Sequence, residues 1–222
     1  LLANEPHLVK PMNEVRMRFS RRGGGIPEYN GPEMIFHYYL PETVDGPVTM
    51  EIMDEVGKVV RAYSSERPAS NVDPAEREPE MATGFVIRGY NRDLKKDKGL
   101  HRISWDMRHQ GSWNANPARS GVNGPMVAPG NFKVRLKVAD RSMEQTFQLL
   151  PDPNVTAAGV SQQDMEEQEA LSLRIIDLQS KAARMADALG KRMKAAKEAE
   201  DTDSELMEKM ERLDRELNTA DG

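Results

Sequence analysis

The side chains that could do chemistry in this sequence are few, and the most suggestive group surrounds one tryptophan. His101, Asp106 and His109 carry imidazole and carboxylate groups, which are ligand types that zinc prefers. On a β-strand, however, positions 101 and 106 point to opposite faces, and position 109 lies beyond the predicted strand end. The spacing therefore predicts no metal site and no bound cofactor. Trp105 is better explained as a large core residue, and Asp106 as a hydrogen-bond acceptor that fixes the following loop.

The sequence also predicts no catalytic site. It contains no serine-hydrolase, metalloprotease, Walker or dinucleotide-binding motif. Its carboxylates do not lie in apolar runs, where burial would raise a pKa as a glycosidase general acid requires. The chain has no cysteine, which removes thiolate nucleophiles and disulfides. A short basic run is more typical of a solvated linker than of an anion site, and consists of Arg16, Arg18, Arg21 and Arg22.

Two aromatic residues in irregular stretches are candidates for contact with a ligand or partner. Tyr29 and Trp113 lie between predicted strands, and exposed rings in such loops can stack on sugars or peptides. The alternative is that these rings hold their loops against the body of the domain. Both interpretations stay open from the sequence.

Charge and hydropathy divide the 222 residues into regions. Residues 161–222 contain 16 acidic and 10 basic residues, a net charge of −6, and the totals of 36 and 31 leave 20 acidic and 21 basic residues before them, a net charge of +1. The concentration of acidity in the C-terminal segment argues against nucleic-acid binding there. No apolar run approaches the ~20 residues that a membrane-spanning helix needs.

The middle of the chain has the pattern of an all-β domain. Apolar residues alternate over 34–40, 48–53, 59–63, 132–138 and 143–150, and a further strand is expected over 99–107 with a register slip between Leu100 and Ile103. A short strand is also expected at 85–87, and one around 15–19. Gly and Pro turns between these runs predict an Ig-like antiparallel β-sandwich. Its core should include Phe36, Tyr38, Ile52, Trp105, Val134 and Leu136.

After residue 155 the apolar period changes from 2 to 3.6, which predicts helices. Ser161, with Asp164 three residues later, is a plausible helix start. An apolar stripe runs for about 35 residues, and a matching one follows the polar run 201–204, so the spacing predicts a long antiparallel helical hairpin. Gly190 could kink or end the first helix. The residues expected to pack inside the hairpin are Ile175, Leu178, Leu189, Leu206 and Leu213. An exposed groove for a partner, or for self-association, is the alternative use of the stripe.

These patterns predict an α+β chain of three parts. Residues 1–33 are rich in Pro and Gly and should form a linker from a preceding domain. Residues 34–153 should form the sandwich and residues 154–222 the hairpin.

Several segments resemble a known bacterial family. The sandwich resembles the Ig-like domain related to that of the flagellar hook-capping protein, and the order of segments is similar to the C-terminal region of exported sortilin-type β-propeller proteins with neuraminidase-like repeats, often labelled glycosyl hydrolases. The resemblance implies export and a propeller outside this chain, which would hold any hydrolase residues. It therefore implies a non-catalytic structural or protein-interaction module, or alternatively a carbohydrate-binding accessory domain. The resemblance is carried by residues 34–40, 46–54, 57–61, 99–108 (with Trp105-Asp106-Met107-Arg108), 127–136 (with Ala128-Pro129-Gly130) and 151–153.

Overall fold

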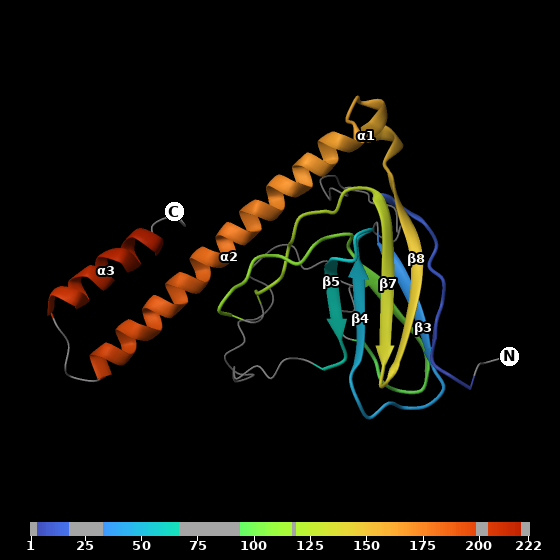
Figure 1. Cartoon of the computed structure of the whole chain (residues 1–222), viewed down its shortest axis with the longest axis horizontal. Helices are drawn as coiled ribbons and strands as arrows, with labels where there is room; N and C mark the ends of the chain where they lie inside the picture. The colour runs from blue at the N-terminus through green and yellow to red at the C-terminus, as the bar shows by residue number, and fades with distance from the viewer. Residues whose placement is uncertain (1–3, 18–32, 67–93, 117–118, 199–203, 219–222) are drawn as a thin grey trace, which may run out of the picture. The chain divides into compact units, whose positions relative to one another are not determined.

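The computed structural model describes residues 4–17, 33–66, 94–116, 119–198 and 204–218, and within them the chain is α+β (Figure 1). One sheet of these residues has the strand order β1 (His7–Leu8), β3 (Met34–Leu40) and β6 (Gly99–Trp105). The other has the order β2 (Glu14–Arg16), β8 (Arg141–Pro151), β7 (Gly130–Val138), β4 (Val48–Met53) and β5 (Val59–Ser64). The helices are α1 (Pro153–Ala157), α2 (Gln162–Glu198) and α3 (Ser204–Asn218).

The chain divides into two compact units. The first unit comprises residues 1–109 and 126–169, and the second comprises residues 110–125 and 170–222. Both sheets, α1 and the start of α2 therefore belong to the first unit, which we call the β unit. The predicted boundary at residue 153 lies inside this unit, because Met165 of α2 is buried and Glu169 is bonded to the loop before β7.

Side chains of the two sheets meet in one apolar core. The six residues predicted for it are buried, with exposed fractions of 1% or less. The ring centroids of Phe36 on β3 and Phe147 on β8 lie 5.4 Å apart, and those of Trp105 on β6 and Phe132 on β7 lie 5.7 Å apart. Aromatic pairs at these distances join the two sheets and contribute beyond the area they bury.

Most strand pairs among the described residues are antiparallel, and two of them, β4–β5 and β7–β8, are hairpins with short connections. The β4–β5 hairpin turns through Gly57, whose φ of 85° favours glycine, and Asp54 accepts the backbone N–H of Lys58 at 2.8 Å. One pair departs from the predicted antiparallel sheet, since β2 pairs with β8 in parallel. A short edge strand far from β8 in sequence can enter in either direction, so a hairpin rule could not predict this pair.

Part of the predicted linker takes part in the β unit. Leu8 on β1 is 1% exposed, and the N–H of Val9 donates to the carbonyl of His37 at 3.0 Å. The strand expected around residues 15–19 appears as β2, while the one expected at 85–87 lies outside the described residues. Regular structure therefore begins earlier than the Pro and Gly content predicted, because one buried leucine and a few hydrogen bonds suffice for a short edge strand.

The expected register slip in β6 is wrong. The strand pairs with β3 without a break from Gly99 to Trp105, and Leu100 is 66% exposed. His101, Ile103 and Trp105 share the buried face instead. The sequence pattern misled because a histidine occupies a core-facing position and a leucine faces solvent.

Candidate functional site

The polar centre of the first unit joins the start of α2 to the loops beside the sheets. Nε2 of His109 forms a short hydrogen bond with Oε1 of Glu169, and Oε2 of Glu169 accepts the N–H of Ala128 at 2.9 Å. His109 is 8% exposed, and the side chain of Glu169 is 21% exposed. Burial raises the pKa of Glu169, but the hydrogen bonds from His109 and Ala128, with the nearby positive charges, outweigh it and leave the pKa below its ordinary 4.5. Both carboxylate oxygens are occupied, so this pair anchors a helix.

Arg16 is also part of this centre. The prediction that places it in a solvated linker is therefore wrong. Its Nε donates to the carbonyl of Val127 at 2.5 Å, and its Nη1 lies 3.7 Å from the sulfur of Met165. Its charge also helps to lower the pKa of Glu169. The partners of Arg16 lie more than a hundred residues away, so no local pattern could identify them. The other arginines of the run lie outside the described residues.

The two histidines considered as metal ligands have separate partners. The ring of His101 lies 5.0 Å from that of Tyr38, and its Nε2 lies 2.6 Å from the carbonyl of Asp97. The hydroxyl of Tyr38 is also bonded, to the carbonyl and N–H of Lys95, and burial raises the pKa of Tyr38 to about 12. These contacts belong to the packing of β3 and β6.

Asp106 does not take the role predicted for it. Its Oδ1 is buried without a hydrogen-bond partner among the described residues. The turn after β6 is held by Trp105, whose Nε1 donates to the carbonyl of Arg108 at 2.8 Å, and by Val127, whose N–H donates to the carbonyl of Met107. The indole ring is thus packed in the core, and its N–H has a hydrogen-bond acceptor.

Trp113, one of the two predicted contact residues, is held within the second unit. Its backbone N–H donates to Oγ of Ser180 at 3.0 Å, and the guanidinium of Arg184 lies 5.4 Å from the ring centroid. Ser180 is buried and its hydroxyl also donates to the carbonyl of Ile176 at 2.7 Å. A cation over one ring face leaves less of the indole for a sugar, which favours the loop-holding interpretation. Tyr29, the other candidate, lies outside the described residues.

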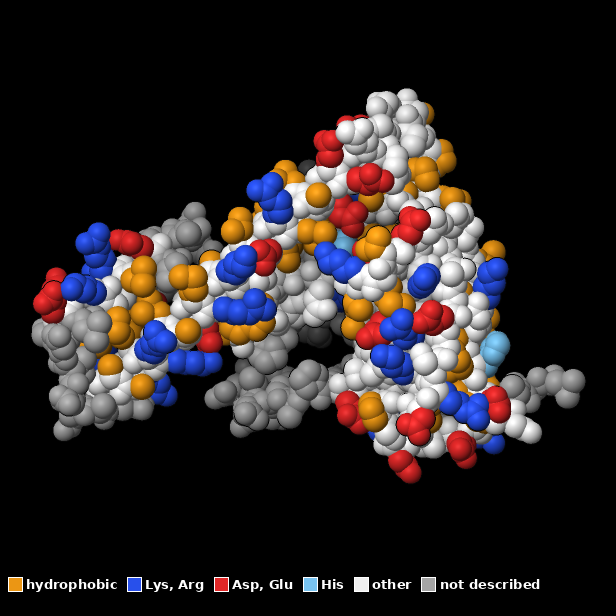
Figure 2. Space-filling view, in the orientation of Figure 1, with side chains coloured by type: hydrophobic (Ala, Val, Ile, Leu, Met, Phe, Trp, Pro, Cys, Tyr) orange, Lys and Arg blue, Asp and Glu red, His pale blue; other side chains and the backbone are white. Residues whose placement is uncertain are grey.

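The most unusual surface of the second unit is an exposed apolar face of α2. We define the α2 stripe as Leu171, Ile175, Leu178, Ala182 and Met185, in which the four large side chains are 58%, 48%, 64% and 61% exposed. All five residues belong to the second unit. Hydrophobic side chains stand at intervals along α2 between lysines and arginines (Figure 2).

The predicted packing inside the hairpin is therefore wrong for part of the stripe. Ile175 and Leu178 face solvent, and Leu213 of α3 is 44% exposed, whereas Leu189 is half-buried. The side chain of Leu206 lies outside the described residues. The physical reason is length, because α3 has 15 residues and α2 has 37, so α3 can cover only part of α2.

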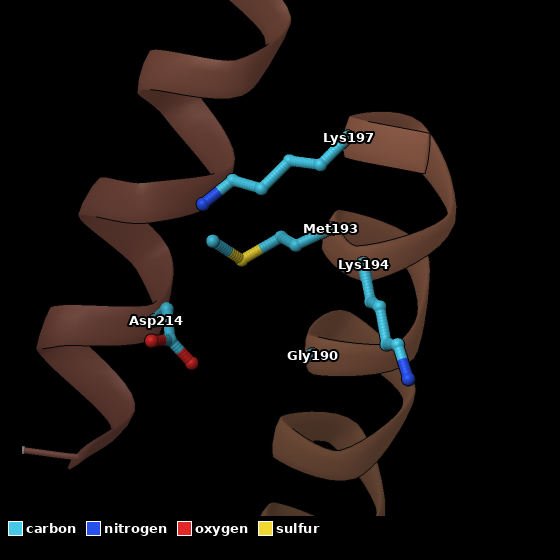
Figure 3. A pocket seen from close by; sticks show the side chains of 5 residues that line it. All are labelled: Gly190, Met193, Lys194, Lys197 and Asp214. Carbon is cyan, nitrogen blue, oxygen red and sulfur yellow. The ribbon is translucent and has the colours of Figure 1, made fainter. Parts of the chain in front are cut away.

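The end of α2 and α3 together line a hollow of about 460 Å³ (Figure 3). Met193 and Lys197 extend from α2 toward α3, where the carboxylate of Asp214 lies. Nζ of Lys197 is 3.6 Å from Oε1 of Glu211. This order of neighbours, with Lys197 beside Glu211 and the earlier Gly190 beside the later Asp214, is that of antiparallel helices. The hollow is open, and its lining carries both positive and negative charges. We therefore interpret it as a gap between two paired helices.

Comparisons with known proteins leave the family open. No family model matches this chain, and a search of curated proteins found no relative. The resemblance to exported propeller proteins therefore stays a prediction. Among the described helices, none is long and apolar enough to cross a membrane.

Proposed function

We propose that this chain is a non-catalytic structural and protein-interaction module of a larger exported β-propeller protein, and that the α2 stripe is its contact surface. The observation that carries the proposal is the exposure of four large apolar side chains on one face of α2, a helix that also carries many charged side chains. Contiguous exposed apolar surface rimmed by charge is typical of sites that bind another protein.

Energetics support this use of the stripe. Burying a large apolar side chain fully contributes about 1.5–3 kcal/mol, so four that are half-exposed or more could together contribute several kcal/mol on binding. The folded single chain does not gain this free energy of burial, because these side chains face solvent. Ser180 and Ile176 occupy a different side of α2, where Ser180 contacts the loop that carries Trp113.

The nature of the β unit and its location belong to the same proposal. We propose that the two sheets form an Ig-like sandwich, which the core between the sheets and the antiparallel pairs of β3, β6, β4, β7 and β8 support. Export follows from the resemblance carried by residues such as Trp105 and Arg108. The carbohydrate-binding alternative gains no support from Trp113, since Arg184 lies over its ring.

The test is binding of the chain to the propeller part of its parent protein or to itself. Light scattering should show a complex of the chain with at least one of them. Leu171→Lys with Leu178→Lys should abolish that complex and leave the far-ultraviolet circular dichroism unchanged. The matched control is Gln163→Lys with Gln179→Lys, which places the same charges on exposed polar positions of α2. A chain that forms neither complex would overturn the proposal.

A further inference from the structure

We infer that the occupant of the α2 stripe is a second copy of this chain, bound with its α2 antiparallel to the first. This inference rests on the proposed function and names the partner of the same surface. It follows from the spacing of the stripe, the distribution of charge along α2 and the position of its neighbours within the second unit.

The spacing is that of a coiled-coil seam. The stripe advances by four, three, four and three residues, and Leu189 follows after four more. Such alternation keeps the side chains on one face of a helix that packs against a partner at a small angle. The seam from residue 171 to 189 is about 27 Å long at 1.5 Å per residue. A heptad pattern of this length is typical of helix pairing and exceeds what a single small ligand would cover.

Charge along α2 selects the antiparallel orientation. Residues 162–168 contain three acidic residues and no basic one, and residues 190–197 contain four basic residues and no acidic one. In an antiparallel pair the acidic end of each helix lies beside the basic end of the other, and this happens twice. A parallel pair would place like charges together at both ends, at a cost in free energy. Local pairs such as that of the exposed Lys191 with Asp187, 2.7 Å apart, offset this field only weakly.

A specific register follows from the seam. In antiparallel pairs the two classes of seam position lie side by side, so Leu178 is opposite the partner's Ala182 and Leu171 opposite the partner's Leu189. The large leucine then meets the small alanine on each side of the two-fold axis, which lies near residue 180. Lys181 lies near its own copy, and Asp177, 2.7 Å from it in the same helix, reduces that repulsion.

Neighbouring elements of the second unit leave the seam accessible. The loop with Trp113 contacts Ser180 and Arg184, which lie on the side of α2 opposite the stripe. The helix α3 meets α2 at Gly190, Met193 and Lys197, beyond the end of the seam. A second α2 can therefore approach residues 171–189 without displacing either neighbour.

The test uses the absence of cysteine in the chain. Leu171→Cys and Leu189→Cys are made in separate chains, and a short bismaleimide cross-linker is added to each and to their equimolar mixture. The predicted register brings position 171 of one copy beside position 189 of the other. Two copies of position 171 lie about 27 Å apart, at 1.5 Å per residue. Cross-linked dimer should therefore form several-fold more in the mixture than in either variant alone.

The control is Lys191→Cys, an exposed position on the other side of α2, which reports random collision; circular dichroism checks that each variant is folded. Efficient cross-linking of each single variant alone would overturn the antiparallel arrangement. Cross-linking of the mixture no greater than the control would overturn the second copy as occupant. In that case binding of the wild-type chain to the propeller part, lost in the double lysine variant, would leave the proposed function standing.

Discussion

At the scale of single residues, the pair His109 and Glu169 fixes where α2 begins relative to the β unit. The carboxylate accepts hydrogen bonds from the imidazole and from the N–H of Ala128, and both side chains are largely buried. Removing one partner of a buried charge-assisted pair leaves the other without its hydrogen bond, so the pair acts as a unit.

Glu169→Gln should lower the free energy of unfolding at pH 7 by about 1–3 kcal/mol, because the amide replaces a charged acceptor. The pKa of Glu169 lies below 4.5 in the folded chain, so its contribution is present above the unfolded pKa and is lost as pH falls through the folded pKa. The deficit of the variant should hold from pH 7 to about 5 and shrink below 4.5. Urea unfolding over this range measures it, with the exposed Glu166→Gln as control; an equal deficit at every pH would refute the explanation.

Arg184 should shield the ring of Trp113. The other tryptophan, Trp105, is 0% exposed, so quenching of the fluorescence by acrylamide reports mainly on Trp113. Arg184→Ala should increase quenching, since it removes the guanidinium that lies 5.4 Å from the ring centroid. Arg192→Ala, on an exposed position of the same helix, should leave quenching unchanged. Equal quenching in both variants would show that the cation does not cover the ring in solution.

At the scale of elements, α2 is one continuous helix with two different faces. The sequence predicted its start correctly, since Ser161 and Asp164 form the expected reciprocal bonds: the N–H of Asp164 donates to Oγ of Ser161 at 3.1 Å, and the N–H of Ser161 donates to Oδ2 of Asp164 at 2.8 Å. The possible break at Gly190 does not occur. Helix propensity at one position is a weak force beside the hydrogen bonds of the flanking turns.

Two glycines should respond in opposite directions to the same substitution. Gly190→Ala should raise the free energy of unfolding by about 0.5–1 kcal/mol, because a Cβ there meets no atom within 4 Å and alanine favours helix. Gly57→Ala should lower it, because its φ of 85° is costly for any residue with a Cβ, although space is open there too. Thermal unfolding of both variants decides this, and a destabilised Gly190→Ala would mean that α2 bends at this residue in solution.

Local patterns predicted most elements and missed the contacts that join them. Alternation found β3, β4, β5, β7 and β8, and all six expected core residues are buried. The parallel β2–β8 pair and the roles of Arg16, His109 and Glu169 depend on partners 41 or more residues away. The sequence pattern showed the α2 stripe, but the prediction placed its side chains inside the hairpin. Spacing shows which residues share a face of a helix and not what lies opposite them.

At the scale of the whole molecule, charge and apolar surface are distributed in a way that suits a connecting module. The β unit satisfies its own core, while the second unit presents the α2 stripe. Raising the salt concentration should weaken self-association moderately, since the paired acidic and basic ends are screened while the apolar seam is not. Sedimentation velocity at low and high salt checks this, and stronger association at high salt would remove the argument from charge.

The most direct measurement is sedimentation equilibrium of the wild-type chain and of Leu178→Lys over a wide range of concentrations. The apparent mass of the wild-type chain should rise from 25.0 kDa toward twice that value as the protein concentration increases. The variant should remain at 25.0 kDa with unchanged circular dichroism, because a lysine at the centre of the seam cannot be buried without cost. A wild-type chain that stays at 25.0 kDa at every concentration, alone and mixed with the propeller part, would contradict the account of the α2 stripe as a contact surface.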